Sequence, residues 1–554
     1  MDKISGEVKM LLFDGELYNK TEIKHELELL GHTFNGDSDV EIVKHAYIEW
    51  QEKSIQKFNG VYAFVIQEAD HNKLFCVRDR IGVKPFFFTV KDNLFIFASK
   101  IKTLLNQLNN PPEIDAQSIA EMILIGPGRT PGYGIFKNIY ELEPGFYGIF
   151  ENGEFKKYQY WDLKDQEHTD NFGQTVEKVR FLAVDSIKRQ LAADPSTSVC
   201  AMLSGGLDSS LITSVAAKYF KERGQKLHAF SVDYKDNARY FNANQFQPNS
   251  DGEYIGRMKN YLSHELFEHH QIILDTQNLV NALYFAVDAR DLPGMADVDA
   301  SLLLFCKEIK NFADIILSGE SADEIFGGYP WYRDKTIREK YGFPWSQSID
   351  FRKSFLKDDF IKNKFFNAND YINERYLKTI NESDVSKTFD HDNKYIKQLV
   401  NLNMKWFMQT LLERQNRMSA YNDLKIRAPY CDYRIAEYLY TVPWEYKDYN
   451  GVEKGLLRVA MRDYLPDEVL WRKKSPYPKT HNPEYLSAVS KILTEIINEP
   501  SSPLLQIVKK EALENLLKSN TSTPWYGQLM TTPQTIAYFI QINFWLGKYK
   551  IKIV

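Results

Sequence analysis

Short apolar segments with alternating polar positions dominate the chain up to about Phe155. Aromatic and β-branched residues are frequent in them, and turn residues separate them, which is typical of antiparallel strands. Two segments with apolar residues near helical spacing, 21–31 and 39–51, are predicted helices. The pattern therefore predicts an α+β first domain with antiparallel sheets. The predicted strands cover residues 9–15, 60–69, 73–80, 84–93, 94–100 and 145–155.

The pattern changes after a polar stretch, residues 161–174, which has no apolar period and is predicted to be a linker. Short continuous apolar runs then alternate with helical segments, which predicts a parallel, doubly wound sheet with both faces covered. Residues 358–440 are helical in period and amphipathic, so a helical part follows. The predicted strands are 198–203, 227–233, 271–275 and 314–319, and the predicted helices are 176–192, 209–223 and one near Leu302.

Composition narrows the classes of function. The chain has 554 residues, 44% hydrophobic and 26% charged, so it can form at least two ordinary globular domains. A net charge of -5 disfavours nucleic acid as the main partner. The apolar runs fall short of the roughly 18 residues that a membrane span needs. The four cysteines are widely spaced without a CxxC pair, so we expect a reduced, cytoplasmic protein without a membrane partner.

The strongest chemical signal is the sequence SGGLDSS, placed between a predicted strand and a predicted helix. Adjacent glycines let backbone amides approach an anion, and a helix N-terminus presents free N–H groups. The segment lacks the GK[ST] of a Walker loop, so the phosphates it binds need not be arranged for attack at the γ position. A serine-capped turn without a ligand is the alternative. The polar and glycine residues of this candidate phosphate loop are Ser204, Gly205, Gly206, Asp208, Ser209 and Ser210.

A second polar segment, LSGESADE, follows the predicted strand at 314–319. Because the carboxyl ends of parallel strands meet at one crevice, we expect this turn to face the phosphate loop. Its carboxylates, Glu320, Asp323 and Glu324, could hold Mg²⁺ beside a triphosphate or accept a proton. The alternative is a solvated acidic helix N-terminus, where carboxylates are favoured in any protein.

Several motifs in one order resemble the asparagine synthetase family. In the second part these are SGGLDSS, LSGESADEIFGGY, RMSAYNDLKIRAPYCD, GVEKGLLR and WRKKSPYPKTHNP, and in the first part FDGELYN, GDSDVEIVKHAY, FNGVYAFVI and VRDRIGVKPFFF. The resemblance implies a glutamine amidotransferase-like domain over 1–160, an incomplete Ntn-hydrolase-like sandwich of antiparallel sheets. It also implies a PP-loop (ATP-pyrophosphatase) synthetase domain over 175–554 with a doubly wound parallel sheet.

The resemblance also implies roles for residues of the second domain. The loop from Ser204 to Ser210 would bind the pyrophosphate part of ATP, and the backbone at Leu203 and Val232 would hold the adenine. Ser318 and Gly319 would lie near the nucleotide. Asp208 and Asp323 would hold Mg²⁺. Glu320 would accept a proton from the attacking ammonia, and Lys454 would offset phosphate charge; without the resemblance, Lys454 could be an ordinary surface cation.

The first domain departs from the family pattern. The family's amidotransferase uses an N-terminal cysteine as nucleophile, whereas residue 2 is Asp2 and the first cysteine is Cys76. The arginine-bearing segment before FDGELYN is also absent. Asp14 stands where an oxyanion-hole asparagine is expected, while Gly15, Glu16 and Asp39 match the glutamine-binding pattern. Either the recorded start is internal to a longer chain, or this polypeptide lacks its own glutaminase. We therefore expect ammonia as the nitrogen donor of this polypeptide.

The predicted activity is ATP-dependent amidation of aspartate to asparagine through a β-aspartyl-AMP intermediate. Its substrates would be aspartate, ATP and glutamine or ammonia, with Mg²⁺, and a homodimer is possible. β-Lactam synthetases and peptide-cyclising relatives share this chemistry, and retention of Glu320 favours the plain synthetase. A catalytically silent nucleotide-binding subunit is the alternative from a different class.

Overall fold

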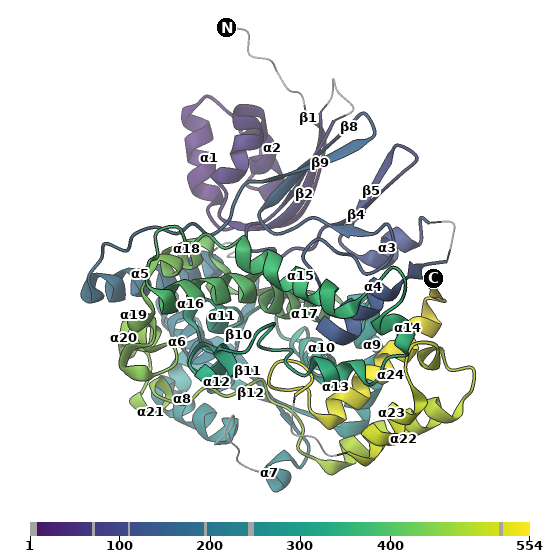
Figure 1. Ribbon diagram of the computed structural model, residues 1–554. Coiled ribbons are helices and arrows are strands. Elements are labelled where there is room, and N and C mark those ends of the chain that lie inside the picture. The colour runs from purple at the N-terminus through teal and green to yellow at the C-terminus, as the bar shows by residue number, and fades with distance from the viewer. Residues whose placement is uncertain (1–7, 69–72, 109–110, 193–196, 242–248, 520–523) are drawn as a thin grey trace.

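The computed structural model describes residues 8–68, 73–108, 111–192, 197–241, 249–519 and 524–554. The N-terminal part lies on one side of a larger, mainly helical body that contains the parallel sheet (Figure 1). No helix among the described residues is long and apolar enough to cross a membrane. All four cysteines are buried and free, as the sequence predicts.

The N-terminal part contains two antiparallel sheets and helices α1 (Lys20–Leu29) and α2 (Asp39–Trp50). One sheet has the order β1-β2-β3-β8-β9 and the other β5-β4-β7, which confirms the antiparallel α+β prediction. The strands are β1 (Val8–Leu17), β2 (Gly60–Glu68), β3 (Leu74–Arg78), β4 (Phe87–Lys91), β5 (Leu94–Ala98), β7 (Tyr140–Glu141), β8 (Phe146–Glu151) and β9 (Glu154–Gln159).

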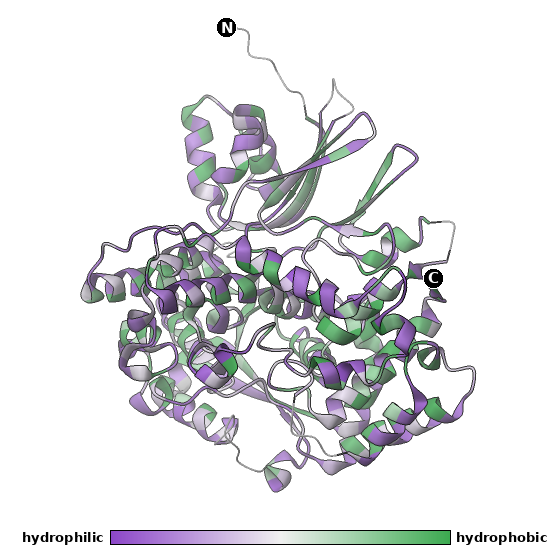
Figure 2. Cartoon of the chain, viewed as in Figure 1, coloured by the Kyte–Doolittle hydropathy of each residue, from purple (hydrophilic) through white to green (hydrophobic). Residues whose placement is uncertain are grey.

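Strand β2 shows why these sheets are layered. Its side chains alternate between the two faces of the sheet, as the pleat requires. Phe64 and Ile66 pack against the helices, whereas Ala63 and Val65 belong to the cluster with the second sheet. Both faces of this strand are therefore buried, and Figure 2 shows the strands of this part as largely hydrophobic.

The larger body is built on a five-stranded parallel sheet with the order β12-β11-β10-β13-β14. The parallel pairing and the presence of β10, β11, β12 and β13 confirm the prediction, which gave no strand order. Cys200 and Ala201 are neighbours on β10 and both are fully buried, so helices cover both faces of the sheet. The strands are β10 (Val199–Met202), β11 (Leu227–Tyr234), β12 (Phe267–Leu274), β13 (Ile315–Leu317) and β14 (Lys425–Arg427).

Helices α6 and α8 pack together over β10, β11 and β12, and helices α9, α10 and α17 form another group. The main helices are α5 (Phe172–Ala192), α6 (Leu207–Lys221), α8 (Asp251–Leu266), α9 (Thr276–Arg290), α10 (Asp297–Ile309), α11 (Ala322–Phe326), α15 (Ala368–Asn381), α16 (His391–Leu402), α17 (Met408–Ala420), α18 (Tyr433–Thr441), α20 (Gly455–Ala460), α22 (Pro483–Asn498), α23 (Lys510–Lys518) and α24 (Thr532–Lys548).

Short elements complete the fold. Strands β6 and β15 pair in parallel and bring residues near the C-terminus against the N-terminal part. These short elements are α3 (Ile101–Leu105), β6 (Glu113–Ile114), α4 (Ala116–Ile119), α7 (Asn237–Tyr240), α12 (Lys335–Arg338), α13 (Ile349–Lys353), α14 (Asp358–Ile361), α19 (Trp444–Lys447), α21 (Asp467–Leu470) and β15 (Lys552–Ile553).

Several elements differ from the sequence-based expectation, among them α8, which was not predicted, and the single strand expected at 145–155, which is the hairpin β8–β9. The pattern gave no helix for α9, which is buried on several sides and so lacks a broad polar stripe. Strand β14 is only three residues long, too short for a period to be recognised. Strand β12 begins four residues earlier than predicted, because Glu268, His269 and His270 interrupt its apolar run.

The predicted linker, 161–174, has no helix or strand until α5 begins at Phe172. It is nevertheless packed: Leu163 is 3% exposed, and the buried carboxylate of Asp165 forms an ion pair with Lys397 of α16. Asp165 also accepts hydrogen bonds from the backbone of Lys387 and from the Thr388 hydroxyl. This segment is therefore a packed part of the structure.

Replacing Asp165 with Asn tests this packing. We expect Asp165→Asn to lower the free energy of unfolding by about 3 kcal/mol, because it leaves the buried Lys397 ammonium without its counter-charge. Asp162→Asn in the same segment is the control: Asp162 pairs at 3.4 Å with the partly exposed Lys405, so its loss should cost about 1 kcal/mol or less. Urea unfolding of both variants measures the difference, and equal costs would show that burial of Asp165 is unimportant.

Candidate active site

The phosphate loop lies at the carboxyl end of β10 and leads into α6. Gly205 has a φ of +70°, and a Cβ placed on it would lie 2.8 Å from the Cβ of Tyr254. The loop is closed by serines, since the Ser204 amide donates to Ser209 Oγ at 3.1 Å. Gly206 is the extended N-cap residue of α6, so the free amides of the first helical turn face the end of the sheet.

The segment after β13 meets this loop directly. A Cβ on Gly319 would lie 3.0 Å from the Cβ of Asp208 and 3.1 Å from the Ser209 nitrogen, so only glycine lets the two segments approach. Ser321 then takes a left-handed conformation, with a φ of 74°, as the N-cap of α11. The sequence prediction that the two loops share one edge of the sheet is therefore confirmed.

Lys454 connects the two loops electrostatically. Its ammonium lies 2.6 Å from Asp208 Oδ2 and 2.8 Å from Asp323 Oδ1, and the residue is 2% exposed. Lys474 adds a second cation 3.1 Å from Asp323. Lys454 also has a positive φ of 55° at the start of α20, a strained conformation of the kind found at functional sites. The reading of Lys454 as an ordinary surface cation is wrong.

The two carboxylates differ in their proton affinity. Burial raises the pKa of Asp323, but Lys454 and Lys474 outweigh it and bring this pKa to about 2. Burial dominates at Asp208 and raises its pKa, although Lys454 opposes the shift. The Oδ1 atom of Asp208 is buried without a hydrogen-bond partner among the described residues. One carboxylate oxygen is therefore available for a further ligand.

Glu320, in the segment after β13, lines the same cavity as Asp208 and Asp323. Its Oε2 lies 3.1 Å from Arg414 of α17, and its backbone amide donates to Ser318 Oγ at 3.3 Å. Burial raises the pKa of Glu320, and Arg414 acts in the opposite direction. Arg414 itself is 3% exposed, and its guanidinium lies 4.8 Å from the centre of the Tyr477 ring. Glu320 is thus a buried carboxylate with one cationic partner.

Glu324 does not belong to this group, which corrects the expectation of three carboxylates facing the ligand. It is 1% exposed, is not among the cavity-lining residues, and accepts a hydrogen bond of 2.6 Å from the Tyr329 hydroxyl. Burial, with the neighbouring Asp323 and Glu320 charges, raises its pKa to about 8. Glu324 is therefore mostly protonated at neutral pH.

One cavity is lined by the backbone or side chains of most predicted synthetase residues. Two of the predicted residues, Gly205 and Ser210, belong to the phosphate loop but do not line the cavity. The predicted residues that line it are Leu203, Ser204, Gly206, Asp208, Ser209, Val232, Ser318, Gly319, Glu320, Asp323 and Lys454.

The sequence motifs did not assign several other residues that line the cavity. Arg472 donates to the Ser204 carbonyl at 3.3 Å and pairs with Asp251 at 2.6 Å, so it braces the phosphate loop. Arg472 and Lys474 belong to the WRKKSPYPKTHNP motif, but the motif did not indicate what either residue does. Asp251 and Arg414 lie on amphipathic helices with no local signal. The further charged or amide-bearing lining residues are Asp251, Arg414, Gln415, Arg458, Arg472, Lys473, Lys474 and Gln528.

Three of the four residues expected to bind glutamine, Asp14, Gly15 and Glu16, lie near the end of β1. Asp14 pairs with Lys84 at 2.8 Å and accepts a hydrogen bond of 3.2 Å from Ser99. A Cβ on Gly15 would lie 2.2 Å from the Val61 carbonyl oxygen, so the pairing with β2 requires glycine there.

Glu16 points instead to the other part of the chain. Both of its carboxylate oxygens accept hydrogen bonds of 2.8 Å from Arg427 of β14, and Lys425 lies 3.5 Å away. Burial raises the pKa of Glu16, but Arg427, together with Lys425 and Lys84, outweighs burial, so this pKa is lowered. Asp39, at the start of α2, has a pKa raised by burial, and its Oδ1 has no hydrogen-bond partner among the described residues.

The position of the phosphate loop in the fold defines the general class of protein. A glycine-rich loop before a helix N-terminus, at the carboxyl edge of a parallel sheet, is how α/β proteins bind phosphorylated ligands. The chain belongs to the asparagine synthase family, because the family model described as asparagine synthase matches residues 178–547. A second model, described as glutamine amidotransferase domain, matches residues 1–161.

Curated relatives agree with the family. The chain is 43% identical to asparagine synthetase [glutamine-hydrolyzing] 3 of Bacillus subtilis, over 99% of this chain and 88% of the relative. It is 29% identical to asparagine synthetase [glutamine-hydrolyzing] 1 of the same organism, over 85% of this chain and 76% of the relative. It is also 24% identical to the mouse asparagine synthetase [glutamine-hydrolyzing], over 84% of this chain and 71% of the relative.

The close contact at Gly205 gives a stability prediction with an internal control. Gly205→Ala combines a left-handed backbone with a clash against Tyr254, whereas Gly224 has a similar φ of +69° with nothing within 4 Å. We expect Gly224→Ala to cost about 1 kcal/mol, from backbone strain alone. Gly205→Ala should cost about 2 kcal/mol more, from overpacking. Chemical denaturation measures both, and equal losses would show that the loop tolerates a side chain.

Proposed function

We propose that this protein is an asparagine synthetase that forms asparagine from aspartate, ATP and a nitrogen donor. The aspartate side-chain carboxylate attacks the α-phosphorus of ATP, and the bond to pyrophosphate breaks. Ammonia then attacks the β-carbonyl of the aspartyl adenylate, and AMP leaves. The observation that carries the proposal is that the phosphate loop, Asp323, Glu320 and Lys454 line one cavity, with Lys454 paired to both Asp208 and Asp323.

The polyphosphate of ATP fits the cationic side of the cavity. The free amides at the start of α6 and the ammonium of Lys454 offer charge-assisted hydrogen bonds to phosphate oxygens. Arg472 and Lys474 line the same side. The backbone at Leu203 and Val232, at the ends of β10 and β11, would then hold the adenine. We propose that Ser204, Ser209 and Ser210 support the loop around the pyrophosphate group, with Ser318 and Gly319 beside it.

The residues at the site also fit Mg²⁺. Asp208 and Asp323 would hold the ion, since carboxylate oxygens are its usual protein ligands and Asp208 Oδ1 has no other partner among the described residues. When bound, Mg²⁺ would offset the charge of the phosphates and of the departing pyrophosphate. Lys454, which pairs with both carboxylates, would also offset part of the negative charge of the phosphates. Its pKa is raised, because the two carboxylates outweigh burial, so it stays charged at neutral pH.

Glu320 is the proposed base. An ammonia molecule that attacks a carbonyl becomes cationic and must lose a proton, so a nearby carboxylate accelerates the second step. Burial raises the pKa of Glu320 and so makes it a stronger base than an exposed glutamate, while Arg414 at 3.1 Å favours its charged form and orients it. The retained base favours a plain synthetase over a relative that uses an internal amine.

The N-terminal part is the proposed source of the family's nitrogen, with Asp14, Gly15, Glu16 and Asp39 as the candidate glutamine contacts. We propose that residues 1–160 form this amidotransferase-like domain of Ntn-hydrolase type, and 175–554 the PP-loop synthetase domain. Asp14 is neutralised by Lys84, so it opposes a developing oxyanion less than an isolated carboxylate would. Glu16 is already held by Arg427, which limits its freedom to bind a ligand.

A silent nucleotide-binding subunit remains the competing function, and one assay separates the two. The synthetase should release pyrophosphate from ATP only when Mg²⁺ and aspartate are both present, and should form asparagine when ammonium is added. Nucleotide binding without pyrophosphate release under these conditions would reject the proposed activity.

Glu320→Gln should separate the two half-reactions. We expect exchange of labelled pyrophosphate into ATP to continue, while amide formation falls by about 10²-fold or more, because only the second step needs the base. Glu324→Gln is the matched control: Glu324 is already mostly protonated at pH 7, so both half-reactions should continue at nearly the original rate. Equal loss of both half-reactions in Glu320→Gln would show instead that Glu320 is already needed for adenylate formation.

Asp208→Asn should abolish adenylate formation while the fold survives. The substitution keeps the volume of the side chain but removes an anionic ligand for Mg²⁺ and the counter-charge of Lys454. Pyrophosphate exchange measured over a range of Mg²⁺ concentrations tests the role. A requirement for more Mg²⁺, or loss of exchange at every concentration, supports it, and exchange at the original rate and Mg²⁺ dependence contradicts it.

A further inference from the structure

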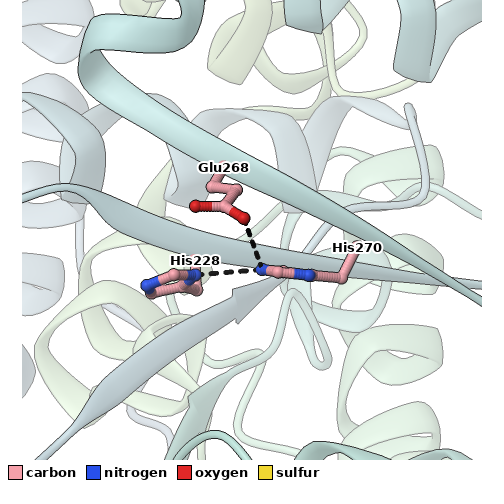
Figure 3. A group of neighbouring side chains, drawn as sticks. All are labelled: His228, Glu268 and His270. Atoms are coloured by element: carbon pink, nitrogen blue, oxygen red, sulfur yellow. Dashed lines mark hydrogen bonds and ion pairs between the residues drawn. The ribbon is translucent and has the colours of Figure 1, made fainter.

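Two histidines and a glutamate gather on the outer strands of the parallel sheet, outside the candidate active site. His228 lies on β11, and Glu268 and His270 lie on the edge strand β12 (Figure 3). In the register of the two strands His228 stands opposite Glu268, and His270 is two residues further along. All three side chains therefore belong to the same face of the sheet.

The potential ligand atoms of this triad lie within 4.8 Å of one another. His228 Nδ1 and His270 Nε2 are 3.0 Å apart, and Glu268 Oε1 is 3.9 Å from His270 Nε2. Ligand atoms around a tetrahedral zinc ion with bonds of 2.0–2.1 Å are separated by roughly 3.3 Å. The observed distances bracket this value, so small side-chain rotations would place the three atoms around one ion.

We propose that His228, Glu268 and His270 bind a zinc ion, with water completing the coordination. Imidazole nitrogen with one carboxylate is a donor set that suits Zn²⁺, whereas Mg²⁺ prefers oxygen ligands alone. The side chains are partly exposed, so the ion can enter from solvent. None of the three residues lines the candidate active-site cavity, so the site is distinct from the proposed nucleotide site.

The strands hold the triad in place. The register of β11 against β12 is continuous over eight pairs, from Leu227 opposite Phe267 to Tyr234 opposite Leu274. The His270 ring stacks on Phe230, with centroids 4.8 Å apart and an interplanar angle of 19°. Phe312 lies against the same ring at 5.2 Å. Such support limits the rotation of His270 and favours a defined geometry for a bound ion.

A second histidine group in the chain provides a matched control. His32 Nδ1 lies 2.9 Å from His45 Nδ1, but the other ring nitrogen of His32 lies 2.9 Å from Glu49. Because the two ring nitrogens point away from each other, these three side chains do not converge on one point. This group has the same residue types as the proposed site without its geometry.

Calorimetric titration of the full chain with ZnCl₂, in the presence of excess Mg²⁺, tests the proposal. We expect one zinc ion to bind and the thermal unfolding midpoint to rise. His270→Ala and Glu268→Gln should each weaken binding by about tenfold or more, given that even loss of an outer-shell partner costs 10–100-fold. His45→Ala should leave the affinity unchanged. X-ray absorption of the zinc-loaded protein should show two imidazole neighbours.

Circular dichroism of each variant checks that it is folded, and Glu268→Gln alters an exposed side chain without changing its size. Retention of the original affinity in both His270→Ala and Glu268→Gln would overturn the proposal. Absence of zinc binding by the unaltered chain, or a zinc spectrum without imidazole neighbours, would overturn it equally.

Discussion

Lys454 places one buried positive charge between the carboxylates of Asp208 and Asp323, which follow two different strands of the parallel sheet. Two buried carboxylates so near each other would repel, and one would take up a proton. The ammonium removes that conflict and holds the phosphate loop against the start of α11. Because Lys454 comes from a third segment, far along the chain, one charge balance fixes the relative positions of all three.

Much of this arrangement could be predicted from sequence, because its parts follow apolar strands and contain glycines where the backbone must turn or approach another segment. Gly205 and Gly319 both meet such demands. Arg414 and Asp251 could not be found in the same way, since each stands on a helix whose pattern reports only burial. Their roles depend on which helix faces the end of the sheet, and that is decided by packing across the whole body.

The same limit applies to the outer strands. The first half of β12 carries Glu268, His269 and His270, so its sequence gives no strand signal, and its strand geometry comes from pairing with β11. The N-terminal part was easier to predict, because its strands are rich in aromatic and β-branched residues and turn residues separate them. The contact of Glu16 with Arg427 was not predictable, since the partners are distant in sequence and belong to different sheets.

Arg427 performs two tasks at once. Its side chain holds Glu16 of β1, and its backbone carbonyl accepts a hydrogen bond of 2.9 Å from the amide of Ser318, two residues before Glu320. Arg427 therefore joins β1 to the turn that carries Glu320, beside other contacts between the two parts such as those of Gln409 with the Ile81 carbonyl and of Asn59 with Asp432. One residue thus contacts β1 with its side chain and the turn before Glu320 with its main chain.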